Sequence, residues 1–121
     1  MHLVTAHGSD SPLQIVAVDD PDHGAPHRYE VTGFDAERNS TAPEGWTARA
    51  SRMTVLFQHG PVDEVGVNGV TQEVLLAILR DRLTLMVNAG PYSETARKEA
   101  LAHVDQALLI LQSGIFDPTK G

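Results

Sequence analysis

The residues best suited to binding a small anion are basic side chains grouped around one aromatic residue. Arg80 and Arg82 precede Tyr92 in the chain, and Arg97 and Lys98 follow it. A guanidinium group presents a rigid fork of donors to phosphate, and an aromatic ring offers a face on which a base can stack. These residue types therefore predict a purine nucleotide as the ligand, with Arg82, Tyr92 and Arg97 as its first contacts.

Competing ion pairs are the alternative role for these basic residues. Glu94 and Glu99 lie close to Arg97 in the sequence, at spacings that allow ion pairs along a helix. Arg28 and Arg52, in the first half of the chain, are weaker candidates for ligand contact. The net charge of −7 argues against long nucleic acids as partners, because such binders need a basic surface. A small anion in an arginine-lined pocket is compatible with that charge, because distant charges are screened over about 10 Å.

The sequence holds no recognisable catalytic motif. It contains no cysteine, which removes thiol catalysis, disulfides and the usual structural zinc sites. Its glycine spacings fit neither a phosphate-binding loop nor a dinucleotide-binding turn. His103 is the only plausible general base, and Asp105, two residues further on, would face elsewhere on a helix. His23 and His27 could collect a metal only if their loop folded back, so we predict no catalytic residue, no metal and no cofactor.

Length and patterning indicate a single domain of the α+β class. A chain of 121 residues supports one core, and its 41% hydrophobic and 21% charged residues are ordinary globular values. Short stretches rich in Val and Ile, bounded by turn-forming residues, predict strands. We expect a small N-terminal antiparallel β-sheet of three or four strands, with strands at residues 13–18, 28–32 and 52–58.

The hydrophobic period changes to that of a helix after residue 70. Thr71 can cap a first helix, which residues 88–91 then stop, and a second helix begins near Ser93 and ends at Gly114. The short connection makes the two helices antiparallel neighbours. The predicted order is therefore a β-rich part at 1–70, a helical hairpin at 71–114 and a loose tail at 115–121.

The predicted helices carry more apolar surface than one small sheet can easily cover. Leu76, Leu85, Leu109 and Ile110 lie off the main apolar stripes of the two helices. Each large aliphatic side chain gains about 1.5–3 kcal/mol when it is buried. Homo-oligomerisation would bury these side chains. The alternative is that they are isolated exposed residues, which folded surfaces routinely carry.

No segment of the sequence predicts secretion or membrane insertion. The first residues lack a basic segment followed by an apolar stretch, and no run of about 18 apolar residues occurs. We therefore expect a cytoplasmic protein.

Several short segments, spread over residues 24–112, resemble one family of phage proteins. They read FQHGP at 57–61, GVNGVTQE at 66–73, DRL at 81–83, GPY at 90–92 and AL at 100–101, with YEVTGF at 29–34 and SRMT at 51–54. Together they resemble the phage anti-defence proteins of the Thoeris type one class. Those proteins bind and hide glycocyclic ADP-ribose, the signal of bacterial Thoeris immunity.

The resemblance implies a non-enzymatic sponge for a signalling nucleotide. It implies an N-terminal sheet, a C-terminal helical hairpin, homo-oligomers from dimers up to hexamers, and ligand capture at subunit interfaces. Some members also hold cyclic oligonucleotides from cGAS-like enzymes, the signals of CBASS immunity. This chain has Val87, Arg97 and Gly114 where the family usually has an aromatic residue, an Asn and the start of a basic segment.

Three functional hypotheses follow from the residues and the resemblance. The first is sequestration of glycocyclic ADP-ribose or a cyclic oligonucleotide, without cleavage, in the cytoplasm of the infected bacterial host. The second is a nucleotide-degrading enzyme. The third is an assembly protein that uses its helical hairpin to oligomerise and binds no small molecule.

Overall fold

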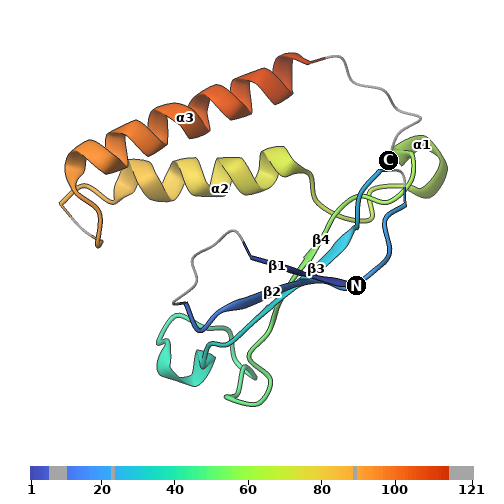
Figure 1. Cartoon of the computed structure of the whole chain (residues 1–121), viewed down its shortest axis with the longest axis horizontal. Coiled ribbons are helices and arrows are strands. Elements are labelled where there is room, and N and C mark those ends of the chain that lie inside the picture. The colour runs from blue at the N-terminus through green and yellow to red at the C-terminus, as the bar shows by residue number, and fades with distance from the viewer. Residues whose placement is uncertain (6–10, 23, 89, 115–121) are drawn as a thin grey trace. The chain divides into compact units, whose positions relative to one another are not determined.

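The chain folds into a β-sheet followed by helices, so its class is α+β (Figure 1). The computed structural model describes residues 1–5, 11–22, 24–88 and 90–114. In these ranges the strands are β1 (His2–Val4), β2 (Gln14–Ala17), β3 (Arg28–Thr32) and β4 (Met53–Leu56). The helices are α1 (Val62–Val65), α2 (Gln72–Leu85) and α3 (Glu94–Ser113), and a short 3-10 helix, η1 (Ala36–Arg38), lies between β3 and β4.

The chain divides into two compact units between His59 and Gly60. The first unit contains the sheet, and the second contains the three α-helices. The sequence instead places the change from sheet to helix after residue 70, because it does not predict α1. That helix is a single turn between Pro61 and Gly66, too short to show a hydrophobic period. The prediction of one domain stays a prediction.

The sheet is antiparallel throughout, and its strands follow one another in chain order, β1-β2-β3-β4. Three strands match the sequence prediction in kind and place: β3 has the predicted bounds, and β2 and β4 are shorter than predicted. The prediction missed β1, whose three residues are too few to show an alternation of apolar and polar side chains. Register places Ile15 opposite Val31, and Val31 opposite Met53, so one face of the sheet is apolar.

A buried serine fastens the connection between β3 and β4. The Ser51 hydroxyl accepts a hydrogen bond from the backbone N–H of Ala36 at 2.8 Å and donates one to the Thr47 carbonyl, also at 2.8 Å. Ser51 and Ala36 are both buried. The connection therefore folds back on itself, and η1 starts where Asp35 caps its first turn through the N–H of Glu37.

Both long helices begin where the sequence predicts. The Thr71 hydroxyl accepts a hydrogen bond from the N–H of Val74 at 3.3 Å, and the Ser93 hydroxyl accepts one from the N–H of Ala96 at 3.1 Å. Each cap satisfies a backbone donor that has no partner inside its helix. The predicted Thr71 cap and the predicted start of the second helix near Ser93 are therefore confirmed.

The two long helices lie side by side (Figure 1). Few of their large side chains are buried. Leu108 of α3 is 1% exposed, and it is the one large apolar side chain that is fully buried in the described part of the chain. Three of the four off-stripe residues, Leu85, Leu109 and Ile110, are more than half exposed. No helix in the described ranges is long and apolar enough to cross a membrane.

Candidate functional site

A pocket of about 260 Å³ lies where the chain passes from α2 to α3. It brings together two of the predicted ligand contacts, Tyr92 and Arg97. Arg82, the third, is exposed in the last turn of α2 and is not among the lining residues given for this pocket. The pocket is lined by Met86, Asn88, Gly90, Tyr92, Glu94 and Arg97.

The shape of this pocket depends on two residues in the left-handed region of backbone conformation. Asn88 has a φ of 58° and Gly90 a φ of 79°. Asn tolerates this region better than most residues, and glycine adopts it freely. A side chain at position 90 would also run into the terminal methyl group of Met86. The turn leaves Tyr92 58% exposed at the pocket.

Arg97 joins the start of α3 to the end of α2. Its side chain is 8% exposed, and its Nη1 donates a hydrogen bond of 2.7 Å to the backbone carbonyl of Leu83. Leu83 lies in the last turn of α2, where backbone carbonyls have no partner within the helix. A cation at this end of a helix is also favoured by the helix dipole. Arg97 therefore has a structural role that the sequence did not indicate.

The other two guanidinium nitrogens of Arg97, Nη2 and Nε, differ from Nη1 in their contacts. Nη2 lies 3.6 Å from Oε1 of Glu94, and the same oxygen lies 3.7 Å from Nζ of Lys98. The alternative ion pair between Arg97 and Glu94 therefore exists alongside the pocket. Nε of Arg97 is buried and has no hydrogen-bond partner in the described ranges. Nη1 of Arg97 is thus occupied, Nη2 is shared with Glu94, and Nε is buried without a hydrogen bond.

An ion pair also links α2 and α3. Nη1 of Arg80 lies 3.7 Å from Oδ1 of Asp105, and both side chains are about half exposed. Asp105 therefore pairs across to α2, as expected for a residue that does not share a helix face with His103. This pair and the Arg97 hydrogen bond join the two helices at separate points.

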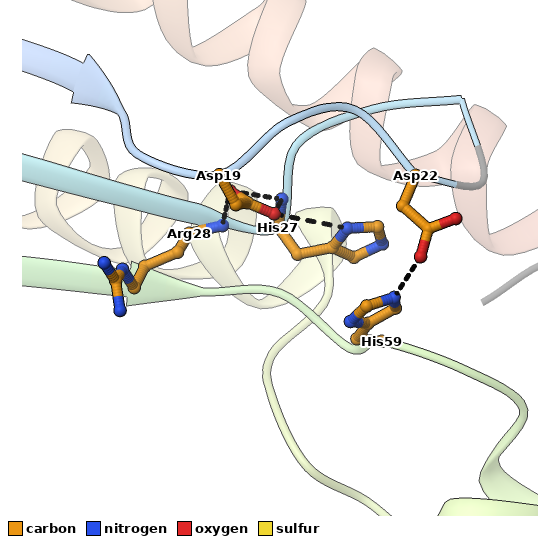
Figure 2. A network of polar contacts seen from close by, with 5 residues as sticks. All are labelled: Asp19, Asp22, His27, Arg28 and His59. Atoms are coloured by element: carbon orange, nitrogen blue, oxygen red, sulfur yellow. Dashed lines mark hydrogen bonds and ion pairs between the residues drawn. The ribbon is translucent and has the colours of Figure 1, made fainter. Parts of the chain in front are cut away.

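The two arginines predicted from the sheet belong to the first unit. Arg52 Nη1 lies 3.7 Å from Oε2 of Glu30 on the neighbouring strand. The Arg28 side chain is exposed and points away from the polar cluster drawn in Figure 2. Neither contributes to the pocket between α2 and α3.

The loop between β2 and β3 is held by the carboxylate of Asp19 (Figure 2). Asp19 accepts hydrogen bonds from the backbone N–H of Arg28 at 2.8 Å and of His27 at 2.9 Å. These hydrogen bonds, first that from Arg28 and then that from His27, lower the pKa of the Asp19 carboxyl below its ordinary value of 3.8. The charged carboxylate thus fixes the start of β3.

Beside Asp19, two histidines stack on each other (Figure 2). The rings of His27 and His59 have centroids 4.2 Å apart and an interplanar angle of 20°. Nε2 of His59 lies 2.8 Å from Oδ2 of Asp22. An imidazole held by a carboxylate can transfer protons, so His59 is a second candidate base besides His103.

Sequence patterning missed the His59–Asp22 pair because it depends on the register between β3 and β4. Phe57 pairs with His27 across these strands, which brings residue 59 beside the loop after β2. His23, the other predicted metal candidate, lies outside the described residues. In the ranges that the structure describes, no group of three or more His, Asp or Glu side chains could hold a metal ion.

Comparison with known proteins finds no match, either among protein-family models or among curated proteins. The pocket of the second unit and the histidine cluster of the first unit are therefore the two candidate sites from which a function can be argued.

The contribution of Asp19 to stability should disappear at low pH. Because the pKa of the Asp19 carboxyl is lowered in the folded chain, this contribution is present at pH values above the unfolded pKa of 3.8 and is lost as the pH falls through the folded pKa. We expect the free energy of unfolding to decrease as the pH is lowered from about 4. Asp19→Asn should make the free energy of unfolding less dependent on pH in this range. Urea denaturation followed by circular dichroism measures both. Asp20→Asn, which removes the same charge, should keep the wild-type dependence, and an unchanged profile for Asp19→Asn would contradict this role.

Removing the Arg97 guanidinium should destabilise the second unit. Arg97→Met leaves the Leu83 carbonyl without its partner, and we expect a loss of about 1.5–3 kcal/mol, as for a hydrogen bond to a charged group. Arg82→Met, an exposed change in the same region, should alter stability by less than about 0.5 kcal/mol. Equal effects of the two substitutions in thermal denaturation would be inconsistent with the structural role of Arg97.

Proposed function

We propose that this chain binds and sequesters a small signalling nucleotide, without cleaving it, as a homo-oligomer in the cytoplasm of an infected bacterium. The observation that carries the proposal is the pocket between α2 and α3, which combines an exposed aromatic ring with a buried guanidinium group. Tyr92 offers a surface for a purine base, and Arg97 offers a donor for a phosphate oxygen. The resemblance to phage anti-defence proteins of the Thoeris type one class points to the same ligand chemistry.

The ligand class follows from what the pocket offers. Glycocyclic ADP-ribose and the cyclic oligonucleotides of CBASS immunity both combine a purine with phosphates. The pocket of about 260 Å³ is smaller than the 300–1,000 Å³ typical of small-molecule sites. One chain therefore encloses part of such a ligand, and a second copy would have to cover the rest.

Exposed apolar side chains support the assembly of several copies. We infer that α2 and α3 form the antiparallel hairpin of the family, and that its outer surface is a subunit interface. Leu85 is 73% exposed, Leu109 59% and Ile110 56% in the single chain. Burying such side chains stabilises association, since each large aliphatic group contributes about 1.5–3 kcal/mol. An assembly built from dimers, up to a hexamer, would bring pockets and apolar surfaces together.

Nucleotide cleavage is the second candidate function, and one observation favours it. His59 is paired with Asp22 at 2.8 Å and its side chain is 49% exposed, so an imidazole with an orienting carboxylate is accessible to solvent. The ring of His27 stacks on one of its faces. We rank this candidate second because a base alone does not supply binding groups for a nucleotide.

A thermal-shift panel tests the first proposal. We expect cyclic ADP-ribose or a cyclic dinucleotide to stabilise the protein, by about 2.7 kcal/mol at 100 times its dissociation constant. Tyr92→Ala should weaken binding by at least about tenfold through lost stacking, whereas Trp46→Ala, an aromatic change in the first unit, should not. The bound nucleotide should be recovered intact after heat denaturation. Cleaved nucleotide would favour the enzyme, and the absence of any shift would favour an assembly protein without a ligand.

Sedimentation equilibrium tests the assembly. We expect the wild-type chain to form dimers or larger species, and Leu109→Glu to shift it toward the monomer because a charge would be buried at the interface. Gln106→Glu adds the same charge at another exposed position of α3 and serves as the control. A wild-type chain that stays monomeric at high concentration would contradict the proposal.

A further inference from the structure

Glu94 places a negative charge inside the pocket that is proposed to receive an anion. Its Oε1 lies 3.6 Å from Nη2 of Arg97 and 3.7 Å from Nζ of Lys98. Glu94 is also one of the residues that line the pocket. The same carboxylate oxygen therefore lies between two cations, one at the pocket wall and one on the outer surface of α3.

The two cations differ in how firmly they are held. The Arg97 side chain is 8% exposed and is anchored by its hydrogen bond to the Leu83 carbonyl, so it cannot follow a ligand. Lys98 is 67% exposed and Glu94 is 55% exposed. Long exposed side chains change rotamer easily, so the carboxylate can move while the guanidinium stays in place.

Arg97 has few donors left for a ligand. Nη1 is used by Leu83 and Nε is buried, which leaves Nη2 as the donor that can meet a ligand. An anion that binds Nη2 would take the position that Oε1 of Glu94 approaches, because carboxylates and phosphates both bind guanidinium donors. The ligand and Glu94 therefore compete for Arg97.

We propose that Glu94 is an internal competitor that sets the anion selectivity of this pocket. In the ligand-free chain Glu94 pairs with Arg97, and an incoming phosphate displaces it toward Lys98. The inference rests on the proposed nucleotide-binding function and adds a specificity-determining residue to it. A ligand with two or more phosphate charges, such as a diphosphate or a cyclic dinucleotide, can displace the carboxylate, whereas a singly charged carboxylate ligand gains little by replacing one carboxylate with another. The pocket would then select phosphorylated ligands.

Isothermal titration of the full chain with two probes tests the competition. ADP-ribose carries the diphosphate, and adenosine carries the same base without charge. We expect Glu94→Gln to bind ADP-ribose about fivefold more tightly than the wild type, the upper range for a half-exposed ion pair, and adenosine equally well. Glu73→Gln is the matched control, because Glu73 occupies the first turn of α2 as Glu94 occupies the first turn of α3. It should bind both probes as the wild type does.

Lys98→Gln provides a second variant, at an exposed position. It removes the alternative partner of Glu94, so it should weaken ADP-ribose binding in the wild-type background and do so less in the Glu94→Gln background. Circular dichroism checks that each variant is folded. The effect of Lys98→Gln in the wild-type background alone keeps the test decisive if Glu94→Gln folds poorly.

The possible outcomes separate this inference from the proposed function. Tighter ADP-ribose binding by Glu94→Gln, with adenosine unchanged, supports the competition. Equal or weaker ADP-ribose binding by Glu94→Gln, while the wild type binds, overturns the competition and leaves the proposed function standing. If neither the wild type nor Glu94→Gln binds ADP-ribose, the inference is overturned, and the proposed nucleotide-binding function on which it rests fails with it.

Discussion

The hydrogen bond from Arg97 to the Leu83 carbonyl is the interaction on which the second unit depends. It ties the first turn of α3 to the last turn of α2 and satisfies a carbonyl that the helix leaves without a partner. In the turn between the helices, Asn88 and Gly90 adopt left-handed conformations. Both residues line the pocket together with the anchored Arg97.

Under the proposed function, this constraint gives Arg97 two roles that compete for the same side chain. As a structural residue it is buried and anchored, which holds its charge in place for a ligand at no further cost in side-chain entropy. As a binding residue it can offer only the nitrogens that the structure leaves, and Glu94 lies against one of them. In the proposed function, an anchored cation beside a half-exposed carboxylate would suit reversible capture. The proposed assembly would bury exposed apolar side chains and bring several such pockets together.

Features that depend on neighbouring residues could be predicted from the sequence. Features that depend on contacts between different segments of the chain could not. Thr71 and Ser93 cap the helices as expected, because a cap involves residues three positions apart. The proximity of Tyr92 and Arg97 follows from the short connection between helices. The burial of Arg97 and the His59–Asp22 pair were missed, because each requires the packing of segments far apart in the chain. The single-turn α1 and the three-residue β1 were too short to produce a pattern.

The most direct test of the account is the side-chain NMR signal of Arg97 during titration with cyclic ADP-ribose or ADP-ribose. A phosphate bound at Nη2 would change the charge environment of the whole guanidinium group, so the Nε–H resonance of Arg97 should shift strongly. The Nε–H signal of Arg82, outside the pocket lining, should change little. Saturable binding that leaves the Arg97 signal in place while other arginine signals move would contradict the claim that this pocket captures the nucleotide.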